Sequence, residues 1–142
     1  MRYSALTQRY FADAPASGVL VGPDCARGAA GSRAAGTWVQ FDVQVDPQDA
    51  PAPRRVRAVR FLAFGCPHVI AVAAWLAEQS VGMLPGARLP ESVQSLQERF
   101  EVPVEKRGRL LIIEDAWCTA MGASLAPHPA GGLDIGAGGP IS

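Results

Sequence analysis

The sequence lacks the features that mark several large classes of protein. Its 13 lysine and arginine residues are balanced by 13 aspartate and glutamate residues, so no net charge favours binding to DNA, RNA or an anionic membrane. No apolar run reaches the roughly 18 residues needed to span a bilayer, and the N-terminus lacks the charged and apolar regions of a signal peptide. We therefore expect a cytoplasmic protein with no nucleic-acid or membrane partner.

Cysteine is scarce and follows no local metal-binding pattern. Cys25, Cys66 and Cys118 are odd in number and far apart, which favours reduced thiols or metal ligands over a disulfide framework. No Cys-x-x-Cys or His-x-x-x-His pattern is present, so tertiary folding would have to assemble any metal site. No Ser-His-Asp constellation, phosphate-binding glycine loop or carboxylate pair accompanies the cysteines, and we therefore expect a protein that is not an enzyme.

The rest of the composition fits one small globular domain. A chain of 142 residues, 49% of them hydrophobic, can close a single core. Residues 1–12 predict a short helix, and residues 37–46 alternate between polar and apolar side chains with the period of a half-buried strand. A proline-rich turn over 46–53 follows, and a second alternation runs from Val56 toward Phe64. We expect these two segments to pair as antiparallel strands.

The second half of the chain changes to helical spacing. Apolar residues recur every three or four positions, which predicts helices over 67–79, 90–99 and 107–122. The stretch 26–33 is rich in glycine and alanine, and we expect a surface loop there. Glycine, proline and alanine dominate residues 124–142, which predicts a disordered tail after a folded domain over 1–123.

The residues around Cys66 resemble one known family. Arg60-Phe61-Leu62-Ala63-Phe64-Gly65-Cys66, followed by Ile70-Ala71, is similar to a stretch of the U-type iron-sulfur cluster assembly scaffolds, of the IscU and NifU N-terminal type. In that family an aromatic residue, a Gly-Cys pair and a small-residue helix follow the last strand. Weaker similarities occur in the same order at Tyr3-Ser4 with Arg9-Tyr10-Phe11, at Val21-Gly22-Pro23-Asp24-Cys25, and at Val102 to Lys106 leading into Glu114-Asp115-Ala116. The resemblance implies an α+β fold, in which a small three-stranded antiparallel sheet packs against several helices, with Cys25 following the first strand.

The same resemblance implies a metal site that two substitutions alter. It places ligands for iron or a nascent iron-sulfur cluster, with zinc as an alternative ion, at Cys25 and Cys66, and His68 is a further candidate ligand. The family follows its first cysteine with Gly-Asp, where this chain has Ala26-Arg27, and the family's His-Cys pair falls on Gly108-Arg109. Arginines at these positions would lower the pKa of the two thiols but would oppose binding of a cation.

Several of these residues also have a structural interpretation. A lone cysteine is often a small buried hydrophobe, and Cys118, beside Trp117 and Met121, is expected to fill the core. Cys118 should lie about 180° around the helix from Arg109, so it is not expected to replace a ligand there. His68, at a helix start, is either a ligand or a solvated side chain.

Two partners follow from the resemblance. One is a cysteine desulfurase, and the other is an Hsp70-type chaperone, because Val102-Pro103-Val104-Glu105-Lys106 resembles the loop by which that chaperone recognises such scaffolds. The alternative for this segment is a connection whose Pro103 separates two helices.

Three functions are therefore open. The chain is a scaffold that binds iron or a nascent cluster through Cys25 and Cys66 and transfers it. Alternatively, it is a scaffold-fold module that binds the desulfurase or chaperone without holding metal. In the third, Cys66 accepts sulfur from a persulfide and acts as a relay.

Overall fold

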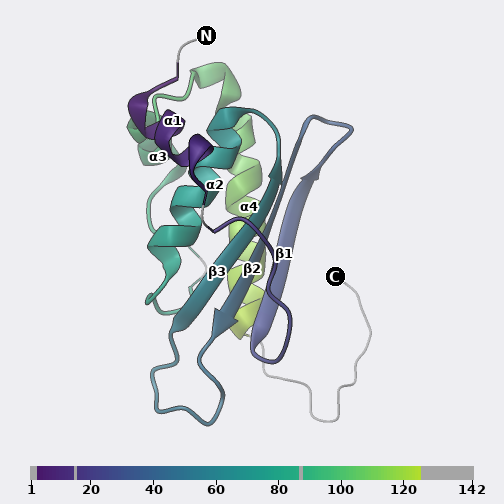
Figure 1. The fold of residues 1–142 in the computed structure, drawn as a ribbon, viewed down its shortest axis with the longest axis vertical. Coiled ribbons are helices and arrows are strands. Elements are labelled where there is room, and N and C mark those ends of the chain that lie inside the picture. The colour runs from purple at the N-terminus through teal and green to yellow at the C-terminus, as the bar shows by residue number, and fades with distance from the viewer. Residues whose placement is uncertain (1–2, 15, 87, 126–142) are drawn as a thin grey trace.

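The computed structural model describes residues 3–14, 16–86 and 88–125. In this part of the chain a sheet of three antiparallel strands, in the order β1-β2-β3, packs against four α-helices, as Figure 1 shows. The expected α+β architecture is confirmed. None of the helices in these ranges is long and apolar enough to cross a membrane. The elements are α1 (Ala5–Ala12), β1 (Cys25–Ser32), β2 (Thr37–Val45), β3 (Val56–Phe64), α2 (Pro67–Ser80), α3 (Val93–Arg99), the 3-10 helix η1 (Val104–Lys106) and α4 (Arg107–Leu125).

The central strand β2 carries the core of the sheet. Its four alternate apolar side chains lie in the core and are at most 3% exposed: Val39, Phe41, Val43 and Val45. Burying each such side chain stabilises the fold by about 1.5–3 kcal/mol. The helix α4 covers β1 and β2 while α2 covers β3. The predicted half-buried strand over 37–46 and its antiparallel partner are therefore confirmed.

The expected surface loop over 26–33 is wrong, because residues 26–32 belong to β1 and only Arg33 lies in the turn that follows. A Cβ atom on Gly28 would lie 2.3 Å from the backbone nitrogen of Ala120 and 2.7 Å from the carbonyl oxygen of Ala116. The backbone of α4 therefore rests directly on β1, where only glycine fits. The glycine and alanine content that suggested a loop is what permits this close packing, and Cys25 opens the first strand instead of following it.

The helices occur where the spacing predicts them, with different ends. The helix α3 begins at Val93, not at residue 90, because the Ser92 hydroxyl accepts a hydrogen bond from the Ser95 N–H and caps its first turn. The helix α4 continues to Leu125, three residues past its expected end. The predicted tail from residue 126 to 142 lies outside the described residues.

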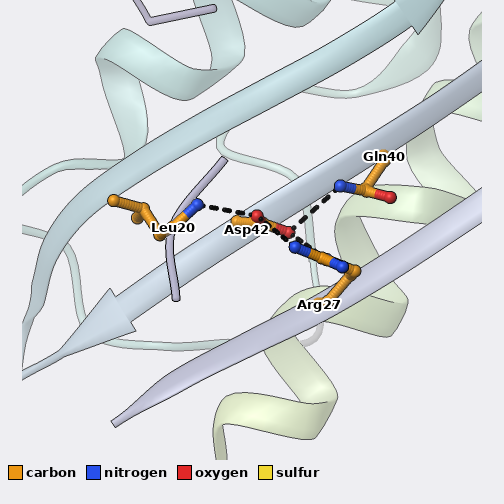
Figure 2. A network of polar contacts seen from close by, with 4 residues as sticks. All are labelled: Leu20, Arg27, Gln40 and Asp42. Atoms are coloured by element: carbon orange, nitrogen blue, oxygen red, sulfur yellow. Dashed lines mark hydrogen bonds and ion pairs between the residues drawn. The ribbon is translucent and has the colours of Figure 1, made fainter. Parts of the chain in front are cut away.

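The segment between α1 and β1 crosses the outer face of the sheet. Ser17 forms a bridge with Phe61 at the edge of β3, and further along the Leu20 N–H donates to Asp42 Oδ2 at 2.8 Å. The Asp42 carboxylate, 1% exposed, also accepts two hydrogen bonds from the Arg27 guanidinium at 2.7 and 3.0 Å (Figure 2). A buried carboxylate needs such partners. The network ties the segment to the sheet and engages Arg27.

Candidate functional site around Cys66

The sheet separates Cys25 from Cys66. Cys25, the first residue of β1, pairs with Gln44 of β2, which in turn pairs with Ala58 of β3. Phe64 lies six residues further along β3, and Cys66 follows it. Six residues of strand span about 20 Å, while two sulfur ligands of one ion lie within about 5 Å of each other. The structure therefore does not bring Cys25 and Cys66 together as ligands of one ion, contrary to the expectation from the resemblance.

The surroundings of Cys25 disfavour its thiolate. Burial and then the negative charges of Asp42 and Asp24 raise the pKa of Cys25. Arg27 was expected to lower that pKa, but its guanidinium is bound to Asp42. This expectation is wrong, since the structure pairs the arginine with a carboxylate on the neighbouring strand. A thiol with a raised pKa is a poor nucleophile and a poor ligand at neutral pH.

Cys66 lies at the junction between β3 and α2. It is the N-cap residue of α2; its side chain makes no capping hydrogen bond, and the Val69 N–H donates to the Cys66 carbonyl oxygen at 3.0 Å. The backbone N–H groups of His68 and Val69 nevertheless act on the nearby sulfur and lower the pKa of Cys66. Pro67 occupies the start of the helix, where a missing backbone N–H has no cost. The partial positive charge of the helix N-terminus favours the thiolate over the thiol.

Two cations from the start of the last helical region complete this environment. The Arg109 side chain lies beside the Cys66 sulfur and stabilises its charged form, and Lys106 of η1 adds a positive charge nearby. Burial acts to raise the pKa of Cys66, but the donors of the first helical turn, Arg109 and Lys106 together outweigh burial and lower it. The expectation that Arg109 lies beside Cys66 and lowers its pKa is confirmed.

His68 is buried at the same junction. Its side chain is 2% exposed, and its ring meets the Tyr3 ring edge-on with 4.7 Å between centroids. Burial, together with the charges of Lys106 and Arg109, lowers the pKa of His68, so the imidazole is neutral. Its Nδ1 is a buried side-chain atom without a hydrogen-bond partner in the described part of the chain. The interpretation of His68 as a solvated side chain is therefore wrong.

The donors at this junction do not fit a metal ion or cluster held by this chain alone. The described residues contain no group of three or more His, Cys, Asp or Glu side chains placed to hold a metal ion. Cys66 and His68 supply one thiolate and one imidazole, and Arg109 and Lys106 bring positive charge beside them. Zinc and iron-sulfur sites generally use about four such ligands.

The β1–β2 hairpin adds a residue that the sequence analysis missed. The Arg33 guanidinium lies over the Trp38 ring at 5.8 Å and over the Phe64 ring at 5.6 Å, and Phe64 precedes Cys66 by two residues. Arg33 was overlooked because the stretch 26–33, which ends with it, was interpreted as a surface loop. The detectable signal was the antiparallel pairing of 37–46 with 56–64, which places Trp38 beside Phe64 at the Cys66 end of the sheet.

The segment from Val102 to Lys106 connects α3 to α4. Pro103 caps η1, and Val102 is buried, which confirms that Pro103 separates two helices. Val104 is 74% exposed, while the Lys106 ammonium lies over the Tyr3 ring at 5.8 Å. Recognition of this segment by a chaperone stays a prediction.

Cys118 lies on α4 away from the junction. It is partly buried and packs against the hydrophobic core, as expected of a core-filling residue. Burial and the charges of Glu114 and Asp115 raise its pKa. Of the three thiols, only that of Cys66 has a lowered pKa.

Comparisons with known proteins agree with this architecture. The family model described as "NifU-like N terminal domain" matches residues 2–126. A solved structure of a nitrogen-fixing NifU-like protein (N-terminal) from Brucella abortus is 18% identical, with a TM-score of 0.61, and covers 85% of this chain and 92% of that one. A Fervidobacterium islandicum protein, described as an iron-sulfur cluster assembly scaffold for the SUF system, is 12% identical, with a TM-score of 0.58, and covers 84% and 96%. A search of curated proteins finds no significant match.

Proposed function

Because the chain belongs to the NifU-like N-terminal domain family of iron-sulfur cluster assembly scaffolds, we propose that it takes part in cluster assembly as a sulfur acceptor. The acceptor is the Cys66 thiolate, which receives sulfur from the persulfide of a cysteine desulfurase. The observation that carries the proposal is the set of donors around the sulfur. Two backbone N–H groups and the Arg109 guanidinium stabilise the thiolate, and its pKa is lowered. Thiolates are the nucleophiles of thiol-disulfide and persulfide exchange.

The reaction needs no oxidant or reductant. The Cys66 thiolate attacks the outer sulfur of the donor persulfide, and a new sulfur-sulfur bond forms while the bond to the donor cysteine breaks. The donor cysteine leaves as a thiolate, and the proton of the persulfide stays with the transferred sulfur. Arg109 and the first-turn N–H groups hold the attacking sulfur in its charged form throughout this approach. In this role the chain is a carrier and not an enzyme.

Iron or a nascent cluster is cargo in this proposal. Cys66 and His68 are the donors that this chain offers at the junction, and a partner would supply the remaining ligands for iron, zinc or a cluster. Cys25 takes no part, because the sheet places it at the opposite end. Cationic neighbours oppose the approach of a metal cation, but they favour an anionic sulfur donor.

A second candidate function needs no sulfur chemistry. The exposed Val104 and the neighbouring residues of η1 form a surface at which a chaperone or desulfurase would bind the scaffold fold without any transfer to Cys66. This candidate predicts that partner binding is indifferent to the loss of the Cys66 thiol.

Transfer of sulfur to the protein tests the proposal. The full chain is incubated anaerobically with a cysteine desulfurase and cysteine, and persulfide-bearing peptides are identified by mass spectrometry after alkylation. We expect the mass of one added sulfur atom on Cys66, its loss in Cys66→Ser, and its retention in Cys25→Ser. An unmodified Cys66, with the desulfurase still bound, would leave only the second candidate.

A further inference from the structure

The surface beside Cys66 combines cations with aromatic rings, and we call it the Cys66 platform. Arg33 reaches it from the β1–β2 hairpin, Phe64 and Trp38 from adjacent strands, and Arg109 from α4. Three separate parts of the chain thus converge at this end of the sheet, where the hairpin, the end of β3 and the start of α2 lie together in Figure 1.

The charge of the platform is not balanced locally. In the described part of the chain, Arg33 and Arg109 form no ion pair with a carboxylate, whereas Arg27, Arg54 and Arg57 each pair with an aspartate. Arg54 and Arg57 belong to the opposite end of the sheet, where β3 begins. Although the molecule is neutral overall, two guanidinium groups without a carboxylate partner among the described residues lie at the Cys66 end of the sheet and produce a local positive field there. Such a field raises the local concentration of anionic partners.

The aromatic part of the platform favours a protein over a small anion. Phe64 is 45% exposed although it is a large apolar side chain. The Arg33 guanidinium lies over both rings, which fixes a long side chain and reduces the entropy that it would lose on binding. Arginine and exposed aromatic residues are also the types that dominate binding energy at protein interfaces.

We infer that the Cys66 platform docks an acidic segment of the protein that delivers sulfur, with carboxylates of that segment against Arg33 and an apolar side chain on Phe64. The inference rests on the proposed function, which supplies the reaction. The charges and aromatic rings of the platform indicate the chemistry of the partner. Docking in this way would bring the donor's persulfide to the Cys66 thiolate.

Disulfide exchange with designed peptides measures this preference directly. The full chain carrying Cys25→Ser and Cys118→Ala retains one thiol, so every exchange reports on Cys66. Three probes are compared. Two are cysteine peptides, one rich in glutamate and one with glutamine in place of each glutamate, and both are mixed disulfides with neutral thiopyridine. The third is the small neutral disulfide dithiodipyridine. The Cys66 thiolate attacks the peptide sulfur, and thiopyridine is released and followed by absorbance.

We expect the acidic peptide to react several-fold faster than its glutamine counterpart, by about 3–10-fold at low salt. The difference should shrink between ionic strengths of about 0.01 M and about 0.15 M, over which the Debye length falls from about 30 Å to about 8 Å. Arg33→Gln should remove much of the preference and leave the rate with dithiodipyridine unchanged. Arg57→Gln is the matched control, because it removes the same charge from the opposite end of β3.

The aromatic contact has its own matched pair of variants. Phe64→Ala should slow both peptides and not dithiodipyridine, while Phe11→Ala, which removes the same side chain at 46% exposure on α1, should change neither. Equal rates for the acidic and neutral peptides, or equal effects of Arg33→Gln and Arg57→Gln, would overturn the inference. If Phe64→Ala slowed neither peptide while the charge preference persisted, charge alone would select the acidic peptide, and the docking surface would be wrong.

These outcomes are independent of the proposed function. Persulfide formation on Cys66 without any charge preference would refute the platform and leave the sulfur acceptor standing. A charge preference without persulfide formation would refute the sulfur acceptor and leave the platform standing, because peptide exchange requires only a reactive Cys66 thiolate.

Discussion

Three cysteines with the same intrinsic chemistry occupy three different environments in this chain. Carboxylates lie near Cys25 and Cys118, and burial acts in the same direction, so the pKa of each thiol is raised. Backbone donors and cations lie near Cys66, and they outweigh burial there. Reactivity at neutral pH is thus assigned to a single residue by its neighbours and not by its exposure, since all three are partly buried.

The pH dependence of alkylation tests this assignment. A lowered pKa means that the thiolate of Cys66 persists to lower pH than an ordinary thiolate, so we expect iodoacetamide to modify Cys66 first at neutral pH. Arg109→Gln should slow that reaction by up to about tenfold, because one pKa unit changes the thiolate fraction by that factor. At alkaline pH, where all thiols are ionised, the variant and the native protein should react alike. Site-resolved mass spectrometry over a pH series measures the rates.

Arg57→Gln is the control for this series, since it removes an equal charge from the far end of the sheet. Identical pH profiles for the three cysteines would contradict the assignment. An Arg109→Gln profile that coincides with that of the native protein would show that the guanidinium does not act on the sulfur.

The residues of the site were only partly predictable from the sequence. The neighbourhood of Cys66 and Arg109 was predictable, because the resemblance to the family places its Gly-Cys motif on Gly65-Cys66 and its His-Cys pair on Gly108-Arg109. Cys25 was misassigned because the register of β1, which carries it to the opposite end of the sheet, is not visible in a run of small residues. The turn that lies at the Cys66 end, residues 33–36, contains no thiol.

At the scale of elements, predictability followed the strength of the side-chain pattern. The strand β2 alternates large apolar and polar residues, and α2 presents an apolar face, so both were found with nearly the observed ends. The strand β1 carries no such pattern, because a helix backbone lies on it and excludes side chains. Composition alone cannot distinguish such a strand from a glycine-rich loop.

Glycine substitutions test the packing of β1 against α4. Gly28→Ala introduces a Cβ that meets the α4 backbone at 2.3 Å, and backbone cannot rotate away as a side chain can. We expect the free energy of unfolding to fall by about 1–3 kcal/mol or more. Gly122→Ala is the matched control: it lies within α4 with no atom within 4 Å of the added Cβ. Helix propensity should make this variant more stable by about 0.5–1 kcal/mol.

Urea unfolding of the two variants and the native protein gives the comparison. If Gly28→Ala and Gly122→Ala shifted stability in the same direction, β1 would not lie under α4 as described. A Gly28→Ala variant that is destabilised but still accepts sulfur would show that the Cys66 junction withstands loosening of the sheet edge.

At the scale of the whole molecule, the resemblance to the scaffold family is confirmed by the family match and by the fold. The two ends of the sheet nevertheless differ in chemistry. One end carries Cys25 with aspartates and the proline-rich loop, and the other carries the Cys66 thiolate with Arg109 and Lys106. A fold that positions one reactive thiolate among cations suits sulfur acceptance better than storage of a metal cluster.

Anaerobic reconstitution tests this central claim most directly. The full chain is mixed with ferrous iron and sulfide, passed through a desalting column, and assayed for bound iron and visible absorption beside Cys25→Ala and Cys66→Ala. The account predicts that the protein alone retains no cysteine-dependent chromophore, although the same preparation accepts sulfur on Cys66 from a desulfurase. A chromophore that disappears in both variants would contradict this prediction. Cys25 and Cys66 would then have to bind the same cluster, although the sheet keeps them about 20 Å apart.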